Sequence, residues 1–221
     1  MSPSQEEQIR LALSPARLGT FEAALGSGAS LSDALALYAW NAQLSAAFLA
    51  PLHICEVVLR NAIAAALEAV YGDRWPWSTV FENSLPNTGG SHFNPRRELL
   101  RARQGQQSSG KVIAELKMVF WQKMLTGRFD ERLWNAHLKR VMPHADRSLS
   151  VQQLRGQVHA DLERLRALRN RIAHHEPIFG RFLEEDFQKI ERLIGLCSPD
   201  AAVWMVNNQQ ATLLFAQRPG R

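Results

Sequence analysis

One long apolar stretch constrains the fold more than any other feature of the sequence. Residues 31 to 71 are apolar nearly all round a helix and are interrupted only by Pro51. A helix that is apolar on every side is expected at the centre of a protein, surrounded by other helices. Because a proline inside a helix removes a hydrogen bond and clashes with the preceding turn, we expect either a helix pair or one long kinked helix.

A second segment, from Leu149 to His175, has the longest uninterrupted helical pattern. Its apolar residues recur every three or four positions and therefore share one face: Leu154, Val158, Leu162, Leu165, Leu168 and Ile172. Such a stripe is typical of a helix with one face in the core.

Start and stop signals place further helices along the chain. Ser14-Pro15 and Asn94-Pro95 each pair an N-cap residue with a proline at the first helical position, and Ser109 and Asp130 are further N-caps. We expect helices over about 15–25, 95–105, 111–125 and 130–141, and two more after residue 175, the last beginning at Ser198-Pro199. The segment 72–94, which contains Gly89-Gly90, predicts a loop, and residues 104–110 (QGQQSSG) predict a linker.

The fold class follows from these patterns. No stretch alternates between apolar and polar residues long enough to predict a strand, and no internal repeat has solenoid spacing. The sequence therefore predicts an all-α helical bundle. Its 221 residues, 46% of them hydrophobic, suffice for one large core. We expect a single domain over 1–221, with a short N-terminal extension at 1–13 and a C-terminal tail at 217–221.

Charge and cysteine content restrict the partners and the compartment. A formal net charge of +5 and a pI near 9.7 are compatible with a polyanionic partner such as RNA but do not require one. The sequence shows no signal-peptide pattern and no run of 18 apolar residues, so no membrane-spanning helix is expected. Cys55 and Cys197 lack metal-ligand spacing, which indicates buried free thiols in a reducing cytoplasm.

A polar cluster, ALRNRIAHHEPIF at residues 167–179, ends the second helical pattern. At about 100° per residue, Arg169 falls inside the apolar stripe, about 40° from Leu165. Asn170 and His174 are four residues apart, so we expect the amide to hydrogen-bond the imidazole. Arg169 and His174, in contrast, diverge by about 140° on an ideal helix.

Two interpretations of this cluster are open. Arg171, His174 and His175 would complement the negative end of the helix dipole, which is a purely structural role. Alternatively, Arg169 and His174 form a site, either because the helix opens before Pro177 or because a twofold partner supplies the second copy. The structural role explains the histidines, but not an arginine within the apolar stripe.

Metal chemistry finds little support in the sequence. The two adjacent histidines point to different helix faces, and neither Glu-x-x-His nor His-Glu-x-x-His occurs, so we expect no metal and no cofactor. A second polar pair, Glu56 and Arg60, lies four residues apart on the apolar helix. The pair is either a half-exposed ion pair or part of a polar pocket.

The polar cluster also carries a resemblance. LRNRIAHHEPIF resembles the signature of the Abi-like (abortive infection) proteins, a bacterial family within the HEPN superfamily of all-α ribonucleases and RNA-binding domains. The likeness spans roughly residues 13 to 205 and includes LSPARLGTF, LALYAWNAQLSAAFLAPLHICEVVLRNAI, GKVIAELKMVFW and LIGLCSPDAAVW. The HEPN motif is an arginine followed by four to six residues and then a histidine, with a polar residue directly after the arginine. Arg169, Asn170 and His174 match it with four intervening residues, and His175 would match it with five.

The resemblance implies a HEPN-like helical fold and metal-independent RNA cleavage in a site formed by two chains, a homodimer. The ribose 2′-OH would attack the adjacent phosphorus and give a 2′,3′-cyclic phosphate and a 5′-OH. His174 would be the general base or acid, since histidine changes charge near neutral pH. Arg169 would hold the phosphate and offset the charge of the transition state. Asn170 would fix the imidazole tautomer.

The resemblance implies supporting residues and a biological context as well. His175 is the alternative proton carrier, and Glu56 or Arg60 would support the pocket. The protein would act in the bacterial cytoplasm, in antiviral defence or as a toxin, under an antitoxin or phage trigger that the resemblance does not identify. Some HEPN toxins are silenced on a tyrosine two residues after the histidine, where this chain has Glu176. The alternative function is a non-catalytic RNA-binding or dimerisation module in phage defence.

Overall fold

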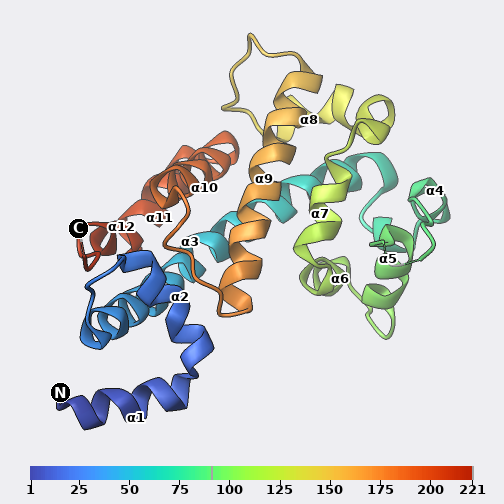
Figure 1. The fold of residues 1–221 in the computed structure, drawn as a ribbon. Helices are drawn as coiled ribbons and strands as arrows, with labels where there is room; N and C mark the ends of the chain where they lie inside the picture. The colour runs from blue at the N-terminus through green and yellow to red at the C-terminus, as the bar shows by residue number, and fades with distance from the viewer. Residues whose placement is uncertain (91, 221) are drawn as a thin grey trace.

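The longest helix, α3 (Leu31–Tyr71), runs through the molecule without a break at Pro51 (Figure 1). It belongs to a computed structural model that describes residues 1–90 and 92–220. A capping box begins the helix: Ser30 Oγ accepts the N–H of Asp33 at 3.2 Å, and Asp33 Oδ2 accepts the N–H of Ser30 at 2.9 Å. Of the two arrangements that the sequence allowed, a pair of separate helices is therefore wrong.

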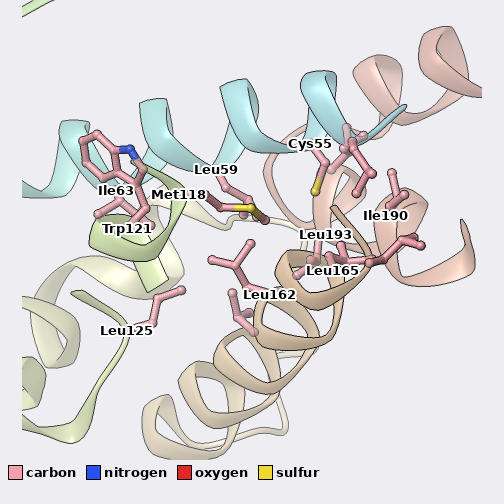
Figure 2. Close-up of a cluster of buried hydrophobic side chains, with 14 of the residues drawn as sticks. Cys55, Leu59, Ile63, Met118, Trp121, Leu125, Leu162, Leu165, Ile190 and Leu193 are labelled. Carbon is pink, nitrogen blue, oxygen red and sulfur yellow. The ribbon is translucent and has the colours of Figure 1, made fainter. Parts of the chain in front are cut away.

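The second long helix, α9 (Val151–Ala173), crosses α3 and faces the core with the predicted stripe (Figure 1). All six stripe residues are buried: Leu154, Val158, Leu162, Leu165, Leu168 and Ile172. Figure 2 shows Leu162 and Leu165 packed among side chains of α3 and α10 (Leu183–Cys197). The prediction of a core-facing helix is confirmed, although the helix ends two residues earlier than expected.

Short helices connect α3 to α9. They are η1 (Trp75–Trp77), α4 (Thr79–Ser84), α5 (Pro95–Arg103), α6 (Ser109–Glu115), α7 (Met118–Met124), η2 (Gly127–Phe129), η3 (Asp130–Trp134) and α8 (Asn135–Val141). The loop predicted over 72–94 is wrong in part, because η1 and α4 lie within it and bury Trp75 and Phe81. The helix predicted over 111–125 is interrupted, since Leu116 adopts an extended conformation between α6 and α7 and buries its side chain. The helix predicted from Asp130 begins as the π-helical turn η3.

The two ends of the chain are more ordered than predicted. The expected N-terminal extension forms a helix, α1 (Pro3–Leu13), which buries no residue and precedes the predicted helix α2 (Pro15–Leu25). After α10 two helices follow instead of one: α11 (Pro199–Asn207) and α12 (Ala211–Phe215). In the predicted tail, Arg218 donates to the carbonyl of Phe179 at 3.3 Å, while residue 221 lies outside the described residues.

The described residues form helices and no strand, and their buried apolar side chains form one connected cluster. The all-α prediction is confirmed. Helix α3 is central, because α2, α7, α9, α10 and α12 all pack against it. By length and composition alone α3 would also suffice to cross a membrane, because an 18-residue segment of it has a mean hydropathy of 1.6. The core helix of a soluble protein passes the same test, so this property is weak support for a membrane span.

Candidate functional site

The predicted polar cluster lies where α9 ends. His174 is the C-cap residue of the helix, and His175 adopts the left-handed conformation with φ of 56°. The N–H of His175 bonds to the carbonyl of Ile172 at 3.0 Å, and the N–H of Glu176 to that of Arg171 at 2.8 Å. These two bonds form a Schellman motif, with a histidine at the position that glycine usually occupies. The helix therefore opens at the histidines.

Side chains from three helices fix the segment that follows the motif. The contacts are Arg171 Nε and Nη2 to the Pro177 carbonyl at 3.0 and 2.8 Å, Arg17 Nη1 to the His175 carbonyl at 2.6 Å, and the Ile178 N–H to Asn41 Oδ1 at 2.8 Å. Arg17 belongs to α2, Asn41 to α3 and Arg171 to α9. The histidines thus lie on a turn that is held to the body of the protein on three sides.

Arg169 is the arginine of α9 that has no hydrogen bond or ion pair within the described residues. The other four are engaged: Arg155 with Asp130 and Leu125, Arg164 with Asp186, Arg166 with Gln122, and Arg171 with Pro177. Although its backbone position lies within the apolar stripe, the Arg169 residue is exposed. The Arg169 side chain is long enough to reach solvent from this position near the helix end.

The predicted hydrogen bond between the Asn170 amide and the His174 imidazole does not form in the described part of the chain. Only their backbones are joined, with the His174 N–H donating to the Asn170 carbonyl at 2.9 Å. His174 is the C-cap residue, with φ of −94° and ψ of 9°, so its backbone has left the helical geometry that the prediction assumed. Both histidines are exposed.

Arg169 and Asn170 line a cleft of about 410 Å³ between α3, α9 and the junction of α6 with α7. Glu56 lines the same cleft from α3, so three of the predicted residues lie together. The other charged lining residues are Glu115, Lys117 and Arg166. Three cationic side chains therefore face two carboxylates, a balance that suits an anionic group better than a metal cation.

Neither histidine lines this cleft. His175 instead borders two other depressions, of about 270 and 380 Å³, beside α2 and the end of α9. Within one chain, the cleft that contains Arg169 therefore lacks both candidate proton carriers. This separation agrees with the divergence of about 140° expected between Arg169 and His174.

Glu56 and Arg60 do not form the predicted ion pair, because no nitrogen–oxygen contact within 4.0 Å joins them in the described residues. Glu56 is half-buried and faces the cleft. Arg60 is half-buried as well, but it does not line the cleft, and its Nε is buried without a hydrogen-bond partner among the described residues. The pair was expected to be either a half-exposed ion pair or part of a polar pocket. Only the second interpretation remains, and only Glu56 lines such a pocket.

The other reactive side chains of the described residues do not form a metal site or contain a reactive thiolate. Within residues 1–90 and 92–220, no group of three His, Cys, Asp or Glu side chains could hold a metal ion. Cys55 is buried and Cys197 half-buried, and both are free thiols, as predicted. Burial raises the pKa of both thiols, that of Cys197 to about 11, so both stay protonated at neutral pH.

Three residues that shape the site were not identified from the sequence: Arg17, Asn41 and Gln122. Asn41 could have been noticed, because it is the one amide among the buried residues of α3. A buried amide needs hydrogen-bond partners and therefore indicates a structural or binding role. Arg17 and Gln122 gave no local signal, since their partners His175 and Arg166 are distant in sequence.

Comparison of the chain with models of protein families, with curated proteins and with solved structures finds no match. The chemistry of the cluster therefore has to be inferred from its residues and geometry.

Proposed function

We propose that the chain is an Abi-like protein of the HEPN superfamily, with a HEPN-like fold, and that it acts as a metal-independent endoribonuclease in phage defence or as a toxin in the bacterial cytoplasm. The motif Arg169, Asn170 and His174, within the longer resemblance of LRNRIAHHEPIF, supports this assignment. Cleavage would proceed by attack of the ribose 2′-OH on the adjacent phosphorus.

The observation that carries the proposal is the unpaired, exposed guanidinium of Arg169. The other arginines of α9 have protein partners, whereas Arg169 has none within the described residues and lines a cleft with a cationic excess. The N–H donors of Arg169 are therefore not used within the described residues and are free to bind a ligand. The planar guanidinium matches a phosphate, to which it donates two parallel hydrogen bonds.

The proposed reaction uses these side chains as follows. His174 removes the proton of the 2′-OH, and the 2′-oxygen forms a bond to phosphorus. The bond from phosphorus to the 5′-oxygen breaks, and this oxygen takes a proton from water, while the proton held on His174 neutralises the hydroxide that remains. Arg169 stabilises the negative charge that collects on the phosphoryl oxygens. The products are a 2′,3′-cyclic phosphate and a 5′-OH.

A homodimer is part of the proposal, because one chain does not assemble the site. The Arg169 cleft contains no histidine, and His174 lies exposed at the end of the same helix. A twofold axis beside the end of α9 would place His174 of the partner subunit next to Arg169. Such an interface uses the same surface on both copies.

A non-catalytic RNA-binding or dimerisation module is the second candidate. The observation that favours it is that Asn170 and His174 form no side-chain hydrogen bond in the described residues. Asn170 therefore does not fix which nitrogen of the imidazole carries the proton, as the proposed catalysis would need. An exposed arginine and histidine would still contact a phosphate backbone, as cationic side chains do in sequence-independent RNA binding.

The experiment that separates the two candidates is incubation of the purified protein with RNA in the presence of a metal chelator. We expect cleavage products with 2′,3′-cyclic phosphate ends, and a loss of roughly a hundredfold or more in rate for Arg169→Ala. Arg140→Ala is the matched control, since it removes an exposed arginine from α8 instead. Equal cleavage by the Arg169 variant, or RNA binding without cleavage, would favour the second candidate.

A further inference from the structure

A groove of about 270 Å³ lies beside the turn that carries the histidines. Helices α2 and α3 form its walls, and Ile172, His175 and Glu176 close it at the end of α9. Its lining is largely apolar and includes Phe21 and Tyr38, whose ring centroids lie 4.9 Å apart at an interplanar angle of 58°. The groove is therefore shaped for a small, largely apolar group rather than for a phosphate.

One amide that lines this groove has a donor that no described residue accepts. Asn41 lines the groove and is only 6% exposed. Its Oδ1 accepts the N–H of Ile178 at 2.8 Å, and a backbone N–H can only donate, so the orientation of the amide is fixed. The Nδ2 group therefore points away from Ile178, and no described residue accepts a hydrogen bond from it. Nδ2 is not among the fully buried atoms that lack a partner, so it reaches solvent at the groove that Asn41 lines and is free to donate to a bound group there.

The shape and the donor together specify the ligand. The half-buried ring of Tyr38, backed by the buried ring of Phe21, offers a surface on which a planar base packs, and such contacts are favourable for any base. Asn41 Nδ2 adds selectivity, since it complements a carbonyl oxygen rather than an amino group. Uracil and guanine carry a carbonyl on the edge where cytosine and adenine carry an amino group. The carboxylate of Glu176 at the rim, 3.5 Å from Arg171, further disfavours an anion.

The groove is placed to serve the proposed nuclease site. Both cavities share α3 and α9: Leu49 and Ile172 line the groove, whereas Glu56 and Arg169 line the cleft. Seven residues of helix separate Leu49 from Glu56, a rise of about 10 Å. A single RNA strand that places its phosphate near Arg169 could therefore place a neighbouring base near the groove.

We propose that this groove binds a keto base, uracil or guanine, of a nucleotide beside the scissile phosphate, with Asn41 Nδ2 donating to the base carbonyl. The proposal rests on the proposed ribonuclease function and makes Asn41 its specificity-determining residue. Tyr38 would pack against the base, and the small side chains of Ala42 and Ala46 would leave room for it.

The test uses the variant Asn41→Asp at pH 8. The carboxylate keeps an acceptor for the Ile178 N–H but replaces the donor by a second acceptor. The wild-type protein should bind uridine and guanosine 3′-monophosphates about tenfold more tightly than the adenosine and cytidine ones, and Asn41→Asp should reverse this order. Gln43→Glu, the same change of an amide to an acid at an exposed position of α3, should leave the order unchanged.

A second variant keeps the proposal testable if Asn41→Asp does not fold. Ala46→Phe fills the groove from its exposed side and should abolish mononucleotide binding. An unchanged base order in folded Asn41→Asp, or no mononucleotide binding by the wild type, overturns the groove proposal even where RNA is cleaved. Keto-selective binding that these variants alter, without any RNA cleavage, supports the groove and overturns the proposed catalysis instead.

Discussion

Asn41 Oδ1 accepts the backbone N–H of Ile178 at 2.8 Å, so one buried amide joins the central helix to the segment that follows the two histidines. The residues are 137 positions apart, and both are almost fully buried. Through this bond the position of the histidine turn depends on the packing of α3. The stability of the fold and the geometry of the candidate site are therefore linked at Asn41.

We expect Asn41→Ala to lower the free energy of unfolding by about 1–3 kcal/mol, because it leaves the buried N–H of Ile178 without an acceptor. Asn41→Asp retains an acceptor and should cost less. Urea denaturation of both variants and of the wild type measures the difference. If Asn41→Ala were as stable as the wild type, the amide would not hold this segment in place.

A substitution of His175, in contrast, is expected to raise the stability of the fold. An L-residue in the left-handed conformation at φ of 56° is unfavourable by about 1–2 kcal/mol, whereas glycine adopts this conformation freely but loses more entropy on folding. We expect His175→Gly to stabilise the protein by about 0.5–1 kcal/mol, measured as a rise in melting temperature. RNA cleavage should persist, since His174 is the proposed proton carrier. A more stable variant without cleavage would assign that role to His175.

The lowered pKa of His159, on α9, leads to a prediction of how the stability of the fold depends on pH. Burial lowers the pKa of His159. The carboxylate of Glu163 opposes this shift, and the cations Lys123, Arg155 and Arg166 add to it. The unfolded chain therefore binds a proton at this histidine more readily than the folded chain does. Above the unfolded pKa of about 6.5, His159 is neutral in both states and costs the fold nothing. As the pH falls below this value, the unfolded chain takes up a proton first, so the free energy of unfolding decreases.

The variant His159→Gln should accordingly lose less stability than the wild type between pH 7.5 and pH 5.5. Urea denaturation at the two pH values gives the comparison. His53→Gln, which changes an exposed histidine of α3, serves as the control. An identical loss of stability in His159→Gln and the wild type would show that His159 does not contribute to acid sensitivity.

The elements that the sequence predicted well are those with strong local signals. The stripe from Leu154 to Ile172 repeats over many turns, so its period identifies both the helix and its buried face. The start of α2 has a serine followed by proline, a combination that depends on neighbouring residues alone. The long periodic segment was therefore predicted with its correct face, and the serine–proline start at its correct position. Ser109 and Asp130, which were expected as N-caps, instead lie within α6 and η3.

Elements decided by distant contacts were predicted less well. Glycines and prolines in 72–94 indicated a loop, but burial of Trp75 and Phe81 stabilises two short helices there. The side-chain hydrogen bond expected between Asn170 and His174 requires both residues to lie in a regular helix. The Schellman motif ends the helix at His174, so this bond does not form in the described residues. The cleft that joins Glu56 to Arg169 depends on how α3 packs with α9, which neither segment encodes alone.

The central claim is that Arg169 of one chain acts with the histidine of another. It is tested most directly by co-expressing two inactive variants, Arg169→Ala and His174→Ala, with different affinity tags and purifying the mixed dimer. In this dimer one composite site retains both an arginine and a histidine, whereas neither chain alone has both. We expect each parent variant to be inactive and the mixed dimer to regain RNA cleavage in chelator, at about half the wild-type rate or less, since at most one of two sites is intact. A mixed dimer that forms but remains as inactive as its parents would contradict the account.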